Sequence, residues 1–425
     1  MAEDHALARS ISSIVGADYI TEQTDSRIDE SGPVLFARPG CTDEVAACLK
    51  LCAEAGAAVV PAGRMTWLDC GNPLERVGVV LSLERMERIV DYSPPDLTAT
   101  VDAGLTLDEL NRVTAGERQW LPLDPPGLNS SSLGAIAACN SSGALRLGFG
   151  TPRDYVIGMQ LVHADGTTSK SGGRVAKNVA GYDMNKLYVG SFGTLAIITQ
   201  LTLKLRPLPD YSSSLLITAR HRDLLHQLAR RVLTSELQPS SVVLIRRLSV
   251  PALTNLPDDS LLIRFIDNQR AVEHQVEWVK RAIDSGYTMA VLDQHLASSV
   301  WTEVADFDSS SIRVKLSVPL SAAAVEFETA FAAHPECVAA ADIGTGIMRL
   351  AFDSSADGVV GSIKRLRASV VAAKGSLVIE KAPAQARREA DAWGDVGSTA
   401  ALMRSIKDRF DPQSLLNPGR FVLGL

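Results

Sequence analysis

The sequence of 425 residues predicts an α+β protein built from two domains and a separate C-terminal segment. Three observations lead to this fold class. Up to about residue 210, short β-branched runs alternate with helical patterns and glycine-rich turns. Beyond it, the order strand–helix–strand–strand–helix–strand occurs twice, as in ferredoxin-like units, which predicts an antiparallel sheet. A helix and the run Leu415–Arg420 then follow. The expected domains are 1–210, 211–382 and 383–425.

The composition is that of a globular protein. Apolar residues make up 46% of the chain and charged residues 21%. With 42 Lys and Arg against 49 Asp and Glu, the net charge is −7, and no basic block is present, so nucleic acid and anionic membrane are not expected partners. Met1–His5 has no secretory character, and no run approaches the ~20 apolar residues of a membrane helix. We expect a cytoplasmic protein, with the inner face of the membrane reached through partner subunits.

The six cysteines do not suggest a metal or iron–sulfur site. They include no CxxC pair, and a zinc site needs four ligands. Cys48 and Cys52 lie one turn apart on the apolar stripe of a helix expected over 42–56, as buried helix residues do. We therefore expect no metal.

The elements of the first domain follow from local patterns. Thr106 and Glu109 form a capping box that opens a helix ending near Gly116. A long strand begins at Leu195 and is stopped by Pro207, after which Asp210–Ser214 is expected to be a linker. Further strands are expected over Ala57–Val60, Val77–Leu83, Arg88–Tyr92, Leu97–Ala103 and Asp154–Asp165.

The two expected copies in the second domain share an element order but no sequence identity. The first copy comprises Ser214–Ala219, a helix over His221–Thr234, Val242–Leu248, Leu261–Ile266, a helix over Arg270–Ser285, and Tyr287–Leu292. The second copy comprises Ile312–Val318, a helix to His334, Cys337–Asp342, Ile347–Phe352, a helix to Ala373, and Ser376–Glu380.

Three glycine-rich clusters suggest a ligand. Pro61–Gly71 follows a strand, where successive backbone N–H groups can form an anion-binding nest. It matches neither GxGxxG nor GxxxxGK[ST], which disfavours a nicotinamide Rossmann fold and a P-loop. The second cluster spans 121–143 and the third 178–195. Close packing explains any one of them, but three together favour a long, phosphate-containing cofactor.

The order of these segments resembles the FAD-binding domain of the p-cresol methylhydroxylase and vanillyl-alcohol oxidase superfamily, in particular the smaller FAD-binding subunit of bacterial glycolate oxidase. The likeness covers residues ~30–210 and the tail, with the middle matched only in general order. It rests on Gly-x-x-Thr-x-Leu-x-x-Gly at 63–71, Pro-Leu-Asp-Pro-Pro at 122–126, Lys177–Asp183, Gly190–Thr194 and the tail Phe410–Val422.

The resemblance implies a PCMH-type FAD-binding domain, a cap domain of two ferredoxin-like units, and a tail that returns to the flavin. FAD is expected to be noncovalent, because the first loop has no His where flavinylated relatives carry one. The implied cofactor-binding residues are Pro61, Gly63, Arg64, Met65, Thr66, Trp67, Pro125, Ser132, Leu133, Gly134, Asn140, Gly143, Gly193, Thr194, Ile198, Asn417 and Arg420.

One departure affects the first loop, where Arg64 and Met65 replace glycines of the relatives. At positive φ each costs on the order of 1 kcal/mol or more. A bond from Arg64 to phosphate would offset this cost; otherwise the site binds FAD weakly.

The implied function is that of an FAD-linked oxidoreductase. The resemblance indicates a subunit of a glycolate oxidase-like 2-hydroxy acid dehydrogenase, working with a second flavin subunit and an iron–sulfur subunit. Catalytic relatives carry paired His residues in the cap, but the segment 341–349 has none. Arg349 is the candidate clamp for a substrate carboxylate, although a solvated strand-edge Arg is equally compatible. Asp342, the nearby carboxylate, would need a pKa about three units higher than usual to act as a base.

Two alternatives stay open. The chain could be a non-catalytic structural or electron-relay subunit, a role that the missing cap histidines favour. We therefore expect the isolated chain to oxidise glycolate or D-lactate poorly, and activity to appear only with the second flavin subunit and the iron–sulfur subunit. It could also be a free-standing FAD-linked oxidase of another alcohol, against which the tail and Lys177–Asp183 argue.

Overall fold

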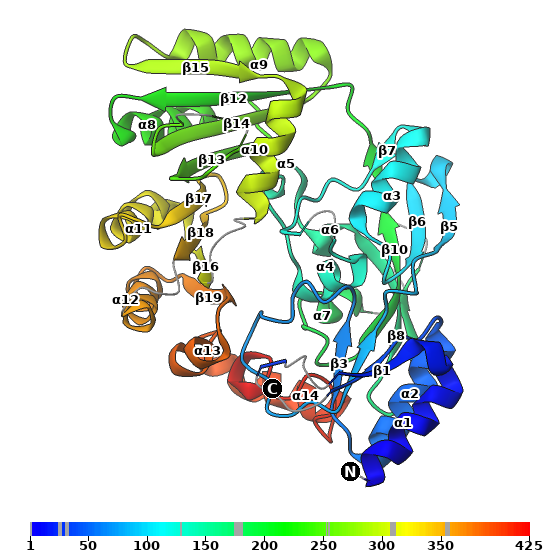
Figure 1. Ribbon diagram of the computed structural model, residues 1–425. Coiled ribbons are helices and arrows are strands. Elements are labelled where there is room, and N and C mark those ends of the chain that lie inside the picture. Colours follow the sequence, from blue (N-terminus) through cyan, green and yellow to red (C-terminus); the bar gives the residue numbers. More distant parts are fainter. Residues whose placement is uncertain are drawn as a thin grey trace.

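The computed structural model describes residues 2–23, 28–29, 34–127, 130–173, 182–251, 253, 256–306, 312–352 and 358–425. Two large parts face each other, the first from the N-terminal half and the second from residues beyond about 210, with the C-terminal segment at their base (Figure 1). The α+β class with an antiparallel cap sheet is confirmed. The exact domain limits 1–210, 211–382 and 383–425 stay a prediction. Among the described residues, no helix has both the length and the apolar character to cross a membrane.

The first part contains two sheets around a large apolar core, with a second, smaller apolar cluster on the four-stranded sheet. The four-stranded sheet has the order β1-β2-β4-β3, with β1 antiparallel and the others parallel. The five-stranded sheet is antiparallel with the order β5-β6-β10-β8-β9. The strands are β1 Ile20–Gln23, β2 Val34–Ala37, β3 Val59–Ala62, β4 Val79–Ser82, β5 Ile89–Ser93, β6 Thr98–Asp102, β8 Val156–Val162, β9 Thr168–Gly172 and β10 Ile197–Lys204. A small pair joins β7 Gln119–Trp120 and β11 Arg206–Pro207.

The helices of the first part pack against these sheets. The capping box predicted at Thr106 is half formed: the Thr106 hydroxyl accepts from Glu109 N at 3.2 Å, while the Glu109 carboxylate pairs with Arg112 instead. The helices are α1 Ala2–Val15, α2 Thr42–Ala55, α3 Leu107–Thr114, α4 Leu133–Cys139, α5 Arg146–Phe149, α6 Pro152–Tyr155 and α7 Asn185–Tyr188.

Two local expectations for the chain are wrong. The strand expected from Asp154 begins only at Val156, because Asp154 lies in the short helix α6 and caps its start by accepting from Thr151 N at 2.8 Å. The linker expected over Asp210–Ser214 is instead the start of a strand, β12 Tyr211–Ala219. Its serines pair with β14, and Ser214 is buried. Backbone pairing with a neighbouring strand outweighs the weak strand propensity of serine.

The cap is one eight-stranded antiparallel sheet with the order β15-β12-β14-β13-β17-β18-β16-β19. Its two strand–helix–strand–strand–helix–strand halves meet at β13 and β17, and α10 Gln294–Asp306, which the sequence analysis missed, connects them. The first half is β12, α8 Arg222–Leu233, β13 Ser241–Arg246, β14 Asp259–Asp267, α9 Gln269–Ala282 and β15 Tyr287–Leu292. The second is β16 Ile312–Ser317, α11 Leu320–Ala333, β17 Val338–Asp342, β18 Ile347–Phe352, α12 Val359–Ala372 and β19 Ser376–Lys381.

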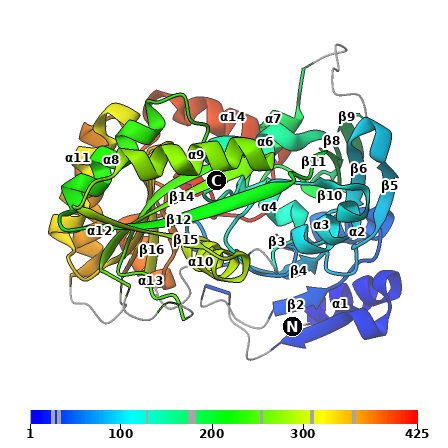
Figure 2. The same cartoon turned by 90° about the horizontal axis from the view of Figure 1, so that it is seen from above.

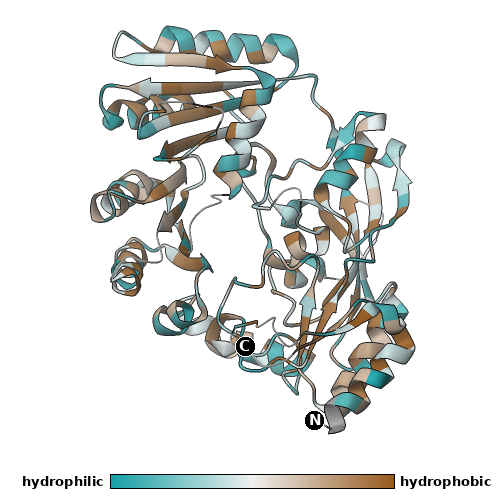
Figure 3. Cartoon of the chain, in the orientation of Figure 1, coloured by the Kyte–Doolittle hydropathy of each residue, from teal (hydrophilic) through white to brown (hydrophobic). Residues whose placement is uncertain are grey.

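The two faces of the cap sheet have different environments. Helices α8, α9, α11 and α12 cover one face, and apolar strand residues such as Val314 and Leu350 are buried beneath them (Figures 2 and 3). Strand residues alternate between faces, so the neighbours Arg313, Lys315 and Arg349 point the other way, toward the first part. The cap therefore presents charged side chains to the junction of the two parts.

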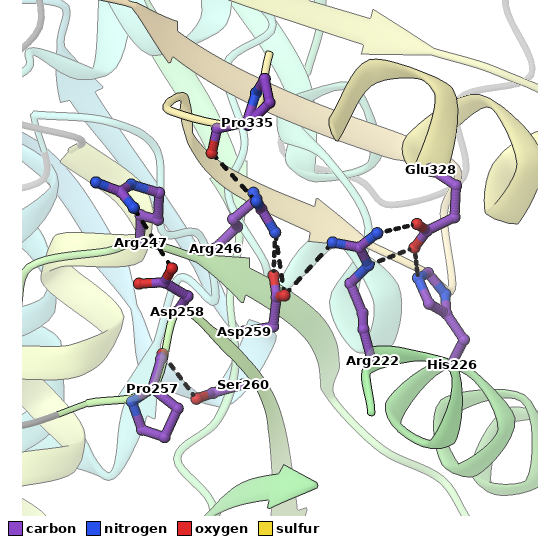
Figure 4. Close-up of polar contacts among 10 residues, drawn as sticks. All are labelled: Arg222, His226, Arg246, Arg247, Pro257, Asp258, Asp259, Ser260, Glu328 and Pro335. Atoms are coloured by element: carbon purple, nitrogen blue, oxygen red, sulfur yellow. Dashed lines mark hydrogen bonds and ion pairs between the residues drawn. The ribbon is translucent and has the colours of Figure 1, made fainter. Parts of the chain in front are cut away.

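A network of ion pairs joins the two halves of the cap (Figure 4). Arg222 of α8 donates to Glu328 of α11 at 2.8 Å, and His226 contacts the same carboxylate at 2.8 Å. Arg222 also reaches Asp259 of β14 at 3.4 Å, which holds Arg246 at 2.8 Å. Ion pairs thus connect side chains of the two halves, and this favours one continuous cap.

The C-terminal segment returns to the first part, as predicted. It contains α13 Ala384–Ala390 and α14 Ala400–Phe410. Leu416 then forms a parallel bridge to Val59, with Val59 N donating to Leu415 O at 2.7 Å and Asn417 N donating to Val59 O at 2.9 Å. The tail thereby extends the four-stranded sheet beside β3.

Candidate functional site

Two connected hollows lie at the junction of the first part, the cap and the tail. The first, here called the groove, is bordered by the loop after β3, by α4 and by the tail. The second, here called the pocket, is bordered by the cap sheet. They share Trp67, Cys70, Cys139 and Phe192. A ligand that fills the groove would therefore border the pocket.

The groove collects most of the residues predicted to bind the cofactor. Asn140 and Gly143 line the pocket instead. Pro125, Leu133 and Thr194 are buried behind the lining and border neither hollow. The predicted residues that line the groove are Pro61, Gly63, Met65, Thr66, Trp67, Ser132, Gly134, Gly193, Ile198, Asn417 and Arg420.

The loop after β3 is shaped by close contacts with the segment before α4. A Cβ at Gly63 would overlap the Oγ of Ser132. The Oγ of Ser131 lies 3.2 Å from Thr66 Oγ1 and accepts from Trp67 Nε1 at 3.3 Å. Met65 has a φ of 60°, so the loop does require the left-handed conformation at one of the two positions where relatives have glycine.

Arg64 points away from the groove. Its guanidinium pairs with Glu87 at 3.1 Å, and it is not among the groove residues. In this arrangement the Arg64 guanidinium is not placed to contact a phosphate in the groove. The charge of Arg64 therefore does not offset the backbone strain at Met65.

The tail closes one side of the groove. Asn417 donates its amide to Phe192 O at 2.7 Å, and Arg420 donates to Cys70 O and Asn72 O, each at 3.1 Å. Gly193 has a φ of 66°, and a Cβ there would lie 3.3 Å from Asn417 Nδ2. The conformation of the 190–194 loop and the tail amide therefore depend on each other.

The groove suits a flat ligand with polar edges. Its lining is mainly small and apolar, and within the described residues the buried Oδ1 atom of Asn417 has no hydrogen-bond partner. The same holds for the buried Oδ1 atom of Asn140, which borders the adjoining pocket. Buried polar atoms without a partner are costly, and a bound ligand that donates hydrogen bonds would satisfy them. The lining is thus compatible with the flat cofactor that the sequence predicts.

The pocket is rich in buried charge. Glu380 of β19 lies 3.0 Å from Arg349, 3.2 Å from Arg313 and 3.9 Å from Lys315. Burial alone would raise the pKa of Glu380, but these three cations outweigh it and lower the pKa to about 2. Burial also lowers the pKa of Lys315. Glu380 is therefore a fixed anion that holds the cations in place.

Arg349 lines the pocket, but its guanidinium already has hydrogen-bond partners. Its Nε donates to Glu380 at 3.0 Å, and its Nη2 donates to Ser142 O at 2.9 Å. It is neither a solvated strand-edge residue nor a free clamp. Because Ser142 belongs to the first part, Arg349 also ties the cap to the loop after α4.

Two carboxyl groups near the pocket titrate close to neutrality. Burial raises the pKa of Asp342 at the end of β17 to about 7, and that of Asp124 to about 6. Asp124 accepts from Gly143 N at 3.1 Å and Leu145 N at 2.9 Å. Burial therefore brings the pKa of Asp342 into the near-neutral range that a catalytic base needs.

Thiols and histidines contribute differently. Burial raises the pKa of Cys70 to about 11, so its thiol, at the boundary of groove and pocket, stays protonated near neutrality. The seven histidines of the sequence are absent from the residues lining the two hollows. Within the described residues, no group of three or more His, Cys, Asp or Glu is arranged to hold a metal ion.

Sequence reasoning missed four charged residues of this region, namely Asp124, Arg146, Lys315 and Glu380. The alternation Ile312, Val314, Leu316 against Arg313, Lys315 was a usable signal, because charged residues that alternate with buried apolar ones occupy the opposite face of a strand. No local pattern showed that this face meets a loop some 170 residues earlier.

Comparison with known proteins relates the chain to flavoproteins. Residues 33–172 match a family model described as an FAD binding domain. The glycolate oxidase subunit GlcD of Bacillus subtilis is 30% identical over 270 residues, which are 62% of this chain and 57% of that protein. A probable mitochondrial D-lactate dehydrogenase of Danio rerio is 35% identical over 204 residues, 47% of this chain and 40% of that protein. The matches thus span about half the length of these relatives.

Solved structures share the whole fold. A p-cresol methylhydroxylase with bound substrate has a TM-score of 0.77 at 15% identity, with 99% of this chain and 97% of that chain covered. A 4-ethylphenol oxidase from Gulosibacter chungangensis has a TM-score of 0.75 at 17% identity, with the same coverage of 99% and 97%. At such low identity these likenesses concern the fold alone.

Proposed function

Because residues 33–172 carry an FAD-binding domain within a p-cresol methylhydroxylase-type fold, we propose that this protein is an FAD-linked dehydrogenase of 2-hydroxy acids. The relatives named as a glycolate oxidase subunit and a D-lactate dehydrogenase support this substrate class. The reaction converts a hydroxyl next to a carboxylate into a ketone or aldehyde.

One observation carries the proposal: a pocket with both cations and a near-neutral carboxyl group opens beside the groove. Arg146, Lys315 and Arg349 provide positive charge for a carboxylate, while Asp342 has a pKa of about 7. A hydroxyl proton is best removed by a base whose pKa lies near the working pH. The pocket therefore combines the two properties that a 2-hydroxy acid needs.

FAD would be held noncovalently by the groove. The loop 63–67, Ser132, Gly193 and Asn417 would contact it, and when bound it supplies the acceptor for a hydride. The chain's own residues then orient the acid, exclude water between the cap and the first part, and take up one proton. Arg349, the predicted carboxylate clamp, already donates to Glu380 and to Ser142 O, so its guanidinium is only partly available to a substrate.

We propose further that electrons leave for an iron–sulfur subunit, in a complex that also contains a second flavin subunit. The Bacillus subtilis relative is itself named as a subunit of glycolate oxidase, which supports an assembly of this kind. The six cysteines of this chain are scattered and lack a CxxC pair, which is consistent with clusters carried by a partner.

The test is a dye-linked assay of the FAD-loaded chain and of the co-expressed complex. We expect turnover of glycolate or D-lactate and none of 3-hydroxybutyrate, whose hydroxyl is one carbon too far from the carboxylate. Turnover by the complex but not by the isolated chain would show that electron transfer depends on the partner subunits. FAD-loaded preparations that oxidise no 2-hydroxy acid would contradict the proposal and favour the non-catalytic subunit.

A further inference from the structure

Arg146 is an uncommitted cation in the pocket. It opens α5 and lines the pocket together with Asp342 and Arg349. Among the described residues its side chain forms no hydrogen bond or ion pair, whereas the side chain of Arg349 already binds Glu380 and Ser142 O. Burial lowers its pKa, and the carboxylate of Asp342 opposes that shift. A half-buried guanidinium without a protein partner is well suited to bind an anionic ligand.

The position of Arg146 is fixed from both sides of the junction. On the first part, Asp124 accepts from Gly143 N and Leu145 N, directly before Arg146. On the cap, Gly148 N donates to Ser240 O at 3.2 Å. A Cβ at Gly344 would lie only 2.6 Å from Leu147 Cδ1, so α5 packs tightly on the turn after β17. The turn that carries Asp342 is thereby held against the helix that carries Arg146.

Asp342 faces both positive and negative groups. One of its oxygens accepts from Gly344 N at 3.1 Å. Arg146, Lys315, Arg349 and Glu380 line the same pocket, and Asp124 acts on Asp342 from the first part. The carboxyl group is buried at the end of β17, and its hydrogen bond from Gly344 N orients it.

We propose that Arg146 binds the carboxylate of the 2-hydroxy acid and that Asp342 accepts its hydroxyl proton. This inference rests on the proposed function. The O–H bond of the substrate breaks and its proton goes to the Asp342 carboxylate; the hydrogen on the same carbon leaves as hydride for FAD, the oxidant; and the C–O bond becomes a carbonyl. Two electrons and two hydrogens thus leave the acid. Arg349 is a positioning residue that holds Glu380 and the loop at Ser142.

Anion binding is tested apart from turnover. Oxalate, a dicarboxylate without an oxidisable hydrogen, is titrated into the FAD-loaded chain by calorimetry, with Arg146→Gln, Asp342→Asn and the control Arg153→Gln. Arg153 is an exposed arginine on the neighbouring helix α6. We expect Arg146→Gln to weaken oxalate binding about 10- to 100-fold, as loss of a charge-assisted bond implies. Asp342→Asn and Arg153→Gln should bind oxalate no more weakly than the unaltered chain.

Proton transfer is tested by the rate at which the acid bleaches the flavin during anaerobic mixing. For the unaltered chain this rate should rise with pH through about 7, where Asp342 loses its proton. Asp342→Asn should lower the rate by roughly 10²–10⁴-fold and remove this pH dependence. Asp342→Glu should restore part of both.

The outcomes separate this inference from the proposed function. Oxalate affinity that is equal in Arg146→Gln and Arg153→Gln would overturn the role of Arg146. A fast, still pH-dependent Asp342→Asn would overturn the role of Asp342. If no 2-hydroxy acid bleaches the flavin although oxalate binding depends on Arg146, the anion site stands and the proposed function fails.

Discussion

Glu380 sets the charge balance of the pocket at the scale of single residues. It is buried and pairs with Arg313, Lys315 and Arg349. Replacing it with Gln would leave three cations close together without their shared anion. Breaking a buried ion pair in this way commonly costs about 3–5 kcal/mol. We expect Glu380→Gln to lower the free energy of unfolding by that amount in urea titrations.

The pH dependence of this contribution has a definite sign. The pKa of Glu380 is lowered from its usual 4.5 to about 2 in the folded protein. The carboxylate therefore stabilises the fold fully at pH values above 4.5, and this stabilisation is lost as the pH falls toward 2. The cost of Glu380→Gln should thus shrink in acid. Glu87→Gln, which removes an exposed pair with Arg64, is the matched control and should change stability by less than about 1 kcal/mol. Equal effects of the two variants would contradict this assignment.

The contribution of Asp342 to stability depends on pH with the opposite sign. Because burial raises its pKa from 3.8 to about 7, the folded state binds a proton more tightly than the unfolded state in this window. Stability from this group is therefore present at low pH and declines as pH rises through 7. Asp342→Asn removes the decline, so its Tm relative to the unaltered chain should increase between about pH 5 and pH 8. A constant difference in Tm across that range would show that Asp342 titrates normally.

Residue-level prediction from the sequence had a clear limit. It drew attention to Arg64 and Met65 as positions where relatives have glycine, and of the two Met65 has a positive φ. The predicted tail residues Asn417 and Arg420 line the groove. Such prediction could not foresee that Arg64 turns toward Glu87, nor that the side chain of Arg146 has no partner within the described part of the chain. Side-chain direction on a loop depends on partners that are distant in sequence, and no periodicity encodes it.

At the scale of elements, α4 shows why a glycine is needed beside the groove. Gly134 lines the groove, but a Cβ there would lie 2.8 Å from Ala103 Cβ and 2.9 Å from Ala103 O, so it would meet the neighbouring backbone before any ligand. The constraint comes from close packing of α4 on the chain after β6, where Gly134 N donates to Ala103 O at 2.8 Å.

Gly134→Ala is therefore expected to shift α4 and to cost about 1–3 kcal/mol, with weaker FAD uptake. Gly116→Ala is the matched control, because a Cβ at Gly116 has no neighbour within 4 Å and its φ is not positive. Urea unfolding and FAD titration followed by flavin fluorescence measure both effects. If Gly134→Ala behaved like Gly116→Ala, the close approach of α4 would not matter for the groove.

Element order was predictable where periodicity was strong. The alternating strands of the cap and its amphipathic helices gave both halves of the sheet. The serine-rich start of β12 was not recognised, because its strand conformation depends on pairing with β14. Helix α10 was also missed, although its Val300 and Trp301 pack into a buried cluster with residues of strands β13, β14 and β17. Tertiary contacts decide such segments.

At the scale of the whole molecule, the groove exists only because distant segments meet. Asp29 near the N-terminus pairs with both Arg387 of α13 and Arg420 of the tail, and Arg420 lines the groove. Arg387 also donates to Gly71 O at 3.1 Å. The family resemblance predicted that the tail returns, but this buried cluster, which fixes it, depends on three segments that no local pattern connects.

FAD held by such a composite groove should come off intact. Neither the loop 63–71 nor the rest of the groove lining provides a His for covalent attachment. The purified chain should be yellow, and heat or acid should release all of its flavin into the supernatant as FAD, as judged by chromatography after the protein is precipitated. Flavin that stays with the precipitated chain would contradict noncovalent binding.

The most direct test of the central claim is the visible spectrum of the FAD-loaded chain during anaerobic addition of glycolate and D-lactate. A pocket with Arg146 for the carboxylate and Asp342 for the proton predicts that one of these acids bleaches the oxidised flavin, and that 3-hydroxybutyrate does not. An oxidised spectrum that persists with every 2-hydroxy acid, in a preparation fully loaded with FAD, would contradict the assignment of this chain as a 2-hydroxy acid dehydrogenase.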